Sequence, residues 1–191
     1  LLMRHHALVL ILALVIAGLP LSEASAGSLA GVTLPDRATV GEQSLTLNGL
    51  ALRSKLTFKV YVAGLYLAHQ GSDAAAIHAA DAPRQMVMHF LRSVDRGKIC
   101  EAWDEGLAAN TANPSAELRE QFAELCKLMP DAANGTQILL AYQPGEGTSI
   151  RIGGVEKGRI AGKPFADALL GCWIGPRPGP GDAFKKALLG G

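Results

Sequence analysis

The sequence predicts an α+β fold in which a mainly antiparallel sheet is backed by a layer of helices, as in an open-faced sandwich. Three observations lead to this prediction. Segments with strand-type alternation are joined by turns of hairpin length, two helical segments separate the first strands from the last, and two further helices follow those last strands. No internal repeat or long linker divides the 191 residues, so we expect one domain.

The first 26 residues are predicted to be a secretory signal peptide, which leaves residues 27–191 as the folded domain. Met3 and Arg4 precede the apolar run Ala7–Leu19, and a small-residue cleavage site ends at Ala26. The apolar run is short for a membrane span, although a retained anchor is the alternative. We therefore expect an exported, periplasmic protein with no stable membrane span after cleavage.

The strands and helices follow from periodicity and from turn residues. Strands are predicted at Val32–Val40 with a break at Pro35-Asp36, around Leu45 and Leu47, at Gln85–Arg92, at Thr136–Gln143, and in a hairpin of Thr148–Ile152 and Val155–Ile160. Helices are predicted at Ala74–Ala80, after a cap at Asp95, from Asn113-Pro114 to Pro130, at Pro164–Ile174 and after a cap at Asp182.

Composition excludes several function classes. The formal net charge is +1, which argues against nucleic acid or an anionic membrane surface as an obligate partner. No phosphate-binding, dinucleotide-binding or hydrolase motif occurs, and the histidines and cysteines show no metal-ligand spacing. We therefore expect no cofactor and no metal.

The three cysteines allow two interpretations. Cys100, Cys126 and Cys172 are widely spaced. They can be three small buried residues, or Cys100 and Cys126 can form a disulfide in an oxidising compartment, with an odd cysteine left free.

The segment Leu47–Ala68 carries the candidate site. It is rich in apolar, β-branched residues, yet Arg53 and Tyr61 lie within it on the same face of a strand, by alternation. One interpretation is a half-buried strand with a solvated basic face. The other is a polar end to an apolar cleft, where an arginine and a tyrosine hold a carboxylate or an oxyanion. Because eight residues of straight strand span about 26 Å, the second interpretation requires the chain to turn, most plausibly at Ser54-Lys55.

Several motifs resemble the chalcone isomerase superfamily, and most closely its bacterial, exported branch. They are Gly49-Leu-Ala-Leu-Arg53, Phe58-Lys-Val-Tyr-Val-Ala-Gly-Leu-Tyr-Leu67, Met88-His-Phe-Leu-Arg92, Glu101-Ala-Trp-Asp-Glu-Gly106, and Phe165-Ala-Asp-Ala-Leu-Leu170 before Trp173. The resemblance implies an antiparallel sheet, a layer of helices and a ligand cleft between them.

The resemblance also implies what Arg53 and Tyr61 do. In the plant enzymes, the arginine that matches Arg53 stabilises an oxyanion during cyclisation of a chalcone. In fatty-acid-binding relatives, an arginine and a tyrosine hold the lipid carboxylate. We therefore expect Arg53 and Tyr61 to bind a small apolar carboxylate such as a fatty acid. The alternatives are an intramolecular lyase acting on a phenolic substrate, with Arg53 as its catalytic residue, and a structural or partner-binding envelope protein with a filled or closed cleft.

Overall fold

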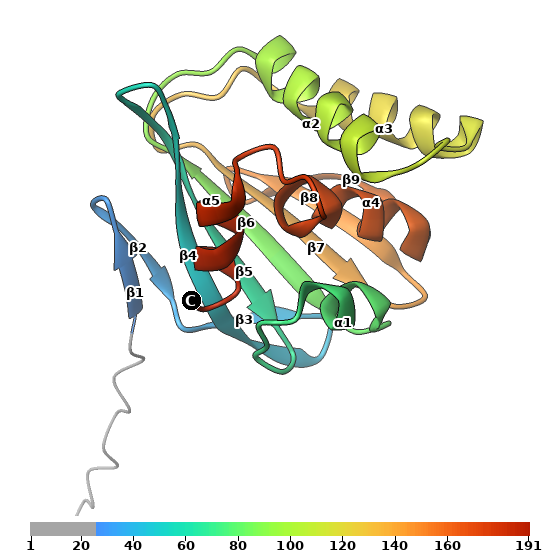
Figure 1. Ribbon diagram of the computed structural model, residues 1–191, viewed down its shortest axis with the longest axis horizontal. Helices are drawn as coiled ribbons and strands as arrows, with labels where there is room; N and C mark the ends of the chain where they lie inside the picture. Colours follow the sequence, from blue (N-terminus) through green and yellow to red (C-terminus); the bar gives the residue numbers. More distant parts are fainter. Residues whose placement is uncertain (1–25) are drawn as a thin grey trace, which may run out of the picture.

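The computed structural model describes residues 26–191, so the predicted signal peptide lies almost entirely outside the described residues. A curved sheet carries helices on one face and a short two-stranded ribbon on the other (Figure 1). This arrangement confirms the predicted α+β fold with a mainly antiparallel sheet. No helix among residues 26–191 is long and apolar enough to cross a membrane.

Seven strands form the main sheet in the order β3-β4-β5-β6-β7-β8-β9, and every neighbouring pair is antiparallel. The strands are β3 (Arg37–Val40), β4 (Gln43–Lys55), β5 (Phe58–Leu67), β6 (Arg84–Phe90), β7 (Gln137–Gln143), β8 (Gly147–Ile152) and β9 (Val155–Ile160). The ribbon pairs β1 (Ala26–Leu29) with β2 (Val32–Pro35). Each strand of the main sheet therefore pairs with the next one in the sequence.

The helices lie close to their predicted positions. They are α1 (Ala74–Ala79), α2 (Arg96–Asn110), α3 (Ala116–Leu128), α4 (Lys163–Ile174) and α5 (Asp182–Leu188). The third starts after the predicted Asn113-Pro114, because the Ser115 hydroxyl accepts a hydrogen bond from the N–H of Leu118 at 3.1 Å and caps the helix there. Asp182 is the first residue of α5, and Gly181 takes the cap position.

The two faces of the sheet bury separate apolar clusters. The larger cluster joins alternate residues of β5 and β6, such as Leu65 and Phe90, to the apolar sides of α2, α3, α4 and α5. The smaller cluster lies under the β1–β2 ribbon and contains Val62, Tyr66 and Val87. Strand alternation thus directs neighbouring residues of one strand into two different cores.

The β4–β5 hairpin turns two residues later than predicted. Lys55 pairs with Phe58, so Leu56 and Thr57 form the turn instead of Ser54-Lys55. A register shift opposite Arg53 and Ser54 marks a bulge in β5, which resets the alternation so that Val60 and Tyr61 both line the helix-covered face. Leu56 lies in the turn, and its side chain is 92% exposed.

The C-terminal helix is held against β4 by a close backbone approach. A Cβ atom at Gly49 would lie 2.6 Å from the carbonyl oxygen of Leu188, so a larger residue would push α5 away. Next to it, the buried Asn48 donates a hydrogen bond to the same oxygen at 2.8 Å. These contacts fix α5, and with it the loop between α4 and α5.

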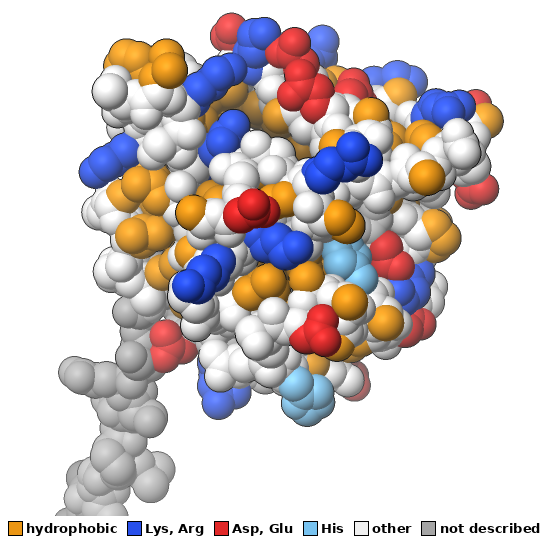
Figure 2. Space-filling model, viewed as in Figure 1, with side chains coloured by type: hydrophobic (Ala, Val, Ile, Leu, Met, Phe, Trp, Pro, Cys, Tyr) orange, Lys and Arg blue, Asp and Glu red, His pale blue; other side chains and the backbone are white. Residues whose placement is uncertain are grey.

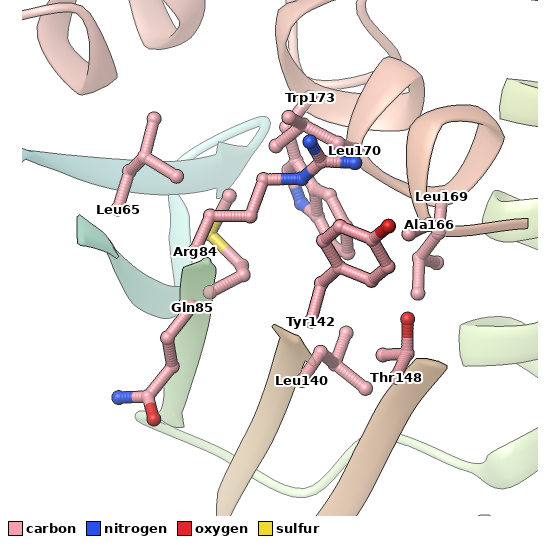
Figure 3. A pocket seen from close by; sticks show the side chains of 11 residues that line it. Leu65, Arg84, Gln85, Leu140, Tyr142, Thr148, Ala166, Leu169, Leu170 and Trp173 are labelled. Carbon is pink, nitrogen blue, oxygen red and sulfur yellow. The ribbon is translucent and has the colours of Figure 1, made fainter. Parts of the chain in front are cut away.

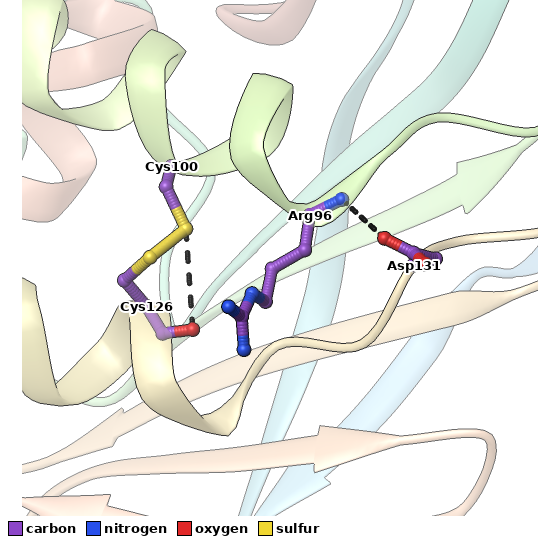
Figure 4. Close-up of a disulfide and its surroundings, with 4 residues drawn as sticks. All are labelled: Arg96, Cys100, Cys126 and Asp131. Carbon is purple, nitrogen blue, oxygen red and sulfur yellow. Dashed lines mark hydrogen bonds between the residues drawn. A yellow bond between two sulfur atoms is a disulfide. The ribbon is translucent and has the colours of Figure 1, made fainter.

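A disulfide between Cys100 and Cys126 joins α2 to α3 (Figure 4). The alternative of a bridged pair therefore holds, and Cys172 is a free, buried cysteine. Figure 4 also shows the N–H of Arg96 donating to the Asp131 carboxylate at 2.8 Å. Asp131 thus caps α2, whereas Asp95 occupies the cap position without a side-chain capping bond.

Removing this disulfide is expected to destabilise the fold. The two cysteines are 26 residues apart. Closing a loop of that size lowers the conformational entropy of the unfolded chain, which stabilises the folded state by about 3 kcal/mol. The double variant Cys100→Ser, Cys126→Ser should therefore lose about that free energy in urea denaturation. Reductant should produce the same loss in the wild type and none in the variant, and an unchanged midpoint would contradict the prediction.

Candidate functional site

Arg53 and Tyr61 lie directly opposite each other on neighbouring strands. Arg53 is near the end of β4 and Tyr61 follows the bulge in β5, and the antiparallel register pairs the two residues. Side chains of such a pair share one face of the sheet, with Cβ atoms about 5 Å apart. In a straight strand Arg53 and Tyr61 would lie roughly 26 Å apart, whereas the hairpin brings them within contact distance of each other.

Both side chains line a cleft of about 560 Å³ between the sheet and the helices. Its walls come from the β4–β5 hairpin, the end of β6, helix α2, the end of α4 and the loop after α4. The apolar and aromatic lining residues are Leu56, Phe58, Val60, Met88, Phe90, Val94, Ile99, Ala102, Trp103, Cys172, Trp173 and Pro180. The cleft is open, whereas the structural alternative predicted a filled or closed one.

The guanidinium of Arg53 is oriented by the loop between α4 and α5. Its Nη1 donates a hydrogen bond to the carbonyl oxygen of Pro180 at 3.1 Å, and the side chain is half-buried. A guanidinium has five N–H donors in one plane, so this bond leaves others to face the cleft. Arg53 is thus oriented by the protein and can still pair with an anion.

Tyr61 presents a neutral hydroxyl to the same cleft. The indole Nε1 of Trp173 donates a hydrogen bond to the Tyr61 oxygen at 3.1 Å, which leaves the hydroxyl proton to be donated. Burial raises the pKa of Tyr61 to about 12, against smaller opposing effects of Trp173 and Arg53. The ring packs against Phe90 and Phe184, with centroids 5.6 Å and 6.0 Å away. Tyr61 is therefore a fixed donor at neutral pH.

The native protein is expected to resist tyrosine ionisation. Burial is the main cause that raises the pKa values of Tyr61, Tyr66 and Tyr142 to about 12, and these are the three tyrosines of the chain. In the unfolded chain they ionise with the ordinary tyrosine pKa of 10.0, so the native state binds more protons between pH 10 and 12 and stability falls as pH rises there. Near-ultraviolet titration should show little tyrosinate at pH 10 until denaturant is added. Substantial ionisation of the native protein at pH 10 would contradict this.

Charged side chains of both signs surround the mouth of the cleft. The basic ones are Arg53, Lys55, Arg92 and Lys98, and the acidic ones are Asp95, Glu101 and Glu105. Lys98 and Glu101 form an exposed ion pair at 2.6 Å within α2. The guanidinium of Arg92 stacks on the ring of Phe58, 4.6 Å from its centroid.

Sequence reasoning missed the groups that orient Arg53 and Tyr61. Trp173 lies in the predicted helix Pro164–Ile174, and the hydrogen bond from its indole to Tyr61 joins residues 112 apart. Pro180 lies between the last two predicted helices, and its contact with Arg53 joins residues 127 apart. Neither contact has a local signal, because both depend on how α4 and α5 pack on the sheet.

A second polar cluster lies between the sheet and α4, away from the cleft (Figure 3). Arg84 is buried, forms an ion pair with Asp167 and stacks on the ring of Tyr142 at 4.7 Å. Lys163 pairs with the same carboxylate. The adjacent cavity, about 20 Å³, is the size of one water molecule, and the buried hydroxyl of Thr148 has no hydrogen-bond partner in the described part of the chain.

Comparisons with known proteins agree with this architecture. The crystal structure of an Arabidopsis thaliana fatty-acid binding protein superposes with a TM-score of 0.66 at 17% identity, covering 87% of this chain and 96% of that chain. A search of curated protein sequences gave no match. The family model described as chalcone isomerase-like matches residues 26–190. The chain therefore belongs to the chalcone isomerase-like family.

Proposed function

We propose that this protein binds a fatty acid or a similar apolar carboxylate in the cleft between the sheet and the helices. The observation that carries the proposal is the pairing of Arg53 with Tyr61 inside that cleft. Arg53 supplies a charge-assisted hydrogen bond to the carboxylate, and Tyr61 supplies a second, neutral one. The ligand's apolar chain extends along the buried side chains of the cleft.

The lining of the cleft suits an amphipathic ligand. Ligand pockets are commonly apolar cavities of about 300–1,000 Å³ with a few placed polar groups. Here the inner wall is formed by Phe90, Ile99 and Trp103, all at most 5% exposed. Burying an alkyl chain there contributes about 0.8 kcal/mol for each methylene removed from water. Affinity should therefore rise with chain length until the cleft is filled.

The likeness to the Arabidopsis protein supports the ligand class, since that protein is described as fatty-acid binding. Export is part of the proposal. The apolar N-terminal segment has the form of a secretory signal. The Cys100–Cys126 disulfide also suits an oxidising compartment such as the periplasm.

The test is to identify what the protein carries. The protein is purified without detergent, its bound lipids are extracted and analysed by mass spectrometry, and the delipidated protein is titrated with palmitate by calorimetry. We expect a co-purifying carboxylic acid and saturable binding at one site. Palmitate methyl ester is the matched control, because it keeps the chain and lacks the charge. Absence of both a bound acid and a saturable titration would overturn the proposal.

A further inference from the structure

The tip of the β4–β5 hairpin exposes large apolar side chains. Leu56 is 92% exposed and Phe58 is 56% exposed, and among the described residues Val155 is the only other large hydrophobic residue this exposed. In Figure 1 this hairpin projects beyond the sheet beside α2, and Figure 2 shows hydrophobic side chains gathered at that corner, next to basic ones. Most exposed apolar residues are isolated, whereas these two lie together at one projecting tip.

The backbone conformation at the tip indicates that Leu56 does not stabilise the fold. Its φ angle is 55°, in the left-handed region that glycine or asparagine adopts with less strain. A leucine at this position therefore strains the turn and gains almost no burial. A side chain that costs stability and is fully exposed suggests contact with something outside the protein.

The charged residues of the hairpin are all basic. Residues 43–67, which span β4 and β5, include Arg53, Lys55 and Lys59 and contain no aspartate or glutamate. Arg92 adds a fourth cation, stacked on the Phe58 ring at 4.6 Å. The acidic residues of the cleft mouth come instead from α2 and the residue before it, and one of them is already paired with Lys98.

We propose that this hairpin tip docks on an anionic lipid surface. Leu56 and Phe58 insert between acyl chains, at the depth where apolar side chains of interfacial proteins lie. Lys55, Lys59 and Arg92 contact the phosphate groups, and each such cation strengthens binding roughly fivefold. Because Leu56 and Phe58 also line the cleft, docking places the mouth of the cleft on the lipid. The inference deepens the proposed function by making the membrane surface the source or destination of the acid.

The test measures docking separately from acid binding. Sedimentation binding is measured on phosphatidylcholine vesicles with and without phosphatidylglycerol, none of which contains free fatty acid. We expect wild-type protein to bind the anionic vesicles, more weakly as salt increases. Leu56→Asn should weaken binding at least tenfold, because it removes a leucine side chain that docking would bury in the lipid. The same substitution should leave the melting temperature unchanged or higher, since it relieves the left-handed strain.

Val155→Thr is the matched control, because Val155 is an exposed apolar residue in a different hairpin. It should bind vesicles as the wild type does. Equal binding by Leu56→Asn, or no binding to anionic vesicles at all, overturns the inference. Concentration-dependent dimerisation that Leu56→Asn abolishes overturns it too, in favour of a second copy of the chain at the tip. Protein that docks but binds no acid overturns the proposed function alone.

Discussion

Replacing Arg53 with alanine is expected to weaken palmitate binding at least about 100-fold while the protein stays folded. The substitution removes the cation that pairs with the carboxylate and leaves that anion in a mainly apolar cleft, where an unpaired charge costs about 3 kcal/mol or more. Arg53 is half-buried, and within residues 26–191 its one hydrogen-bond partner is the Pro180 carbonyl, so the fold loses little. Calorimetric titration and a thermal melt measure the two effects.

Two further variants test whether the loss of palmitate affinity is due to the guanidinium of Arg53. Lys55→Ala removes a cation of the same strand at the cleft mouth, two residues away, and should change affinity by less than about fivefold, as an exposed charge does. Arg53→Lys keeps the charge but loses the planar donors, so its affinity should fall between wild type and Arg53→Ala. Palmitate affinity that is equal in wild type and Arg53→Ala would rule out Arg53 as the carboxylate partner.

Breaking the second polar cluster is expected to cost about as much stability as removing the disulfide. Asp167→Ala should lower the free energy of unfolding by about 3 kcal/mol, because it leaves the buried guanidinium of Arg84 without its counter-ion. Lys163 loses the same partner, although it is more exposed and also bonds to the carbonyl of His78. Urea denaturation measures the change.

The control for Asp167→Ala is an ion pair on the surface. Glu146 pairs with Arg159 at 3.2 Å, and both side chains are exposed. Glu146→Ala should therefore cost less than about 1 kcal/mol. The double variant Arg84→Met, Asp167→Leu should recover much of the stability, because it removes both charges together. A loss equal to that of Asp167→Ala would show that the cluster stabilises the fold by something other than charge pairing.

Most of the fold could be predicted because the helices and strands follow from the local spacing of apolar residues. The apolar positions of the second long helix, Leu118, Phe122 and Leu125, recur three and four residues apart, and all three are buried. Alternation in β6 separates Met88 from Val87, and the structure assigns them to different cores. Strand β1 was not predicted, and the other errors lie at element ends, where a cap residue such as Ser115 decides between neighbouring starts.

The site was only partly predictable. Alternation and motif resemblance singled out Arg53 and Tyr61, but the turn was placed two residues early because Leu56 is a residue that rarely adopts a positive φ. Arg84 was not singled out, since a lone arginine at a strand start looks exposed until its distant partner Asp167 is known. Net charge gave no sign of a basic hairpin, because it sums over residues that lie far apart in space.

The order of the strands has a consequence for how the cleft forms during synthesis. Since each strand of the main sheet pairs with its predecessor, the sheet can extend hairpin by hairpin as the chain emerges. The contact between Arg53 and Pro180 joins residues 127 apart, and Pro180 follows all seven strands of the main sheet in the sequence. Arg53 is therefore oriented only after every strand of the main sheet has been made, so a protein truncated before α5 should form its sheet and lack a finished cleft.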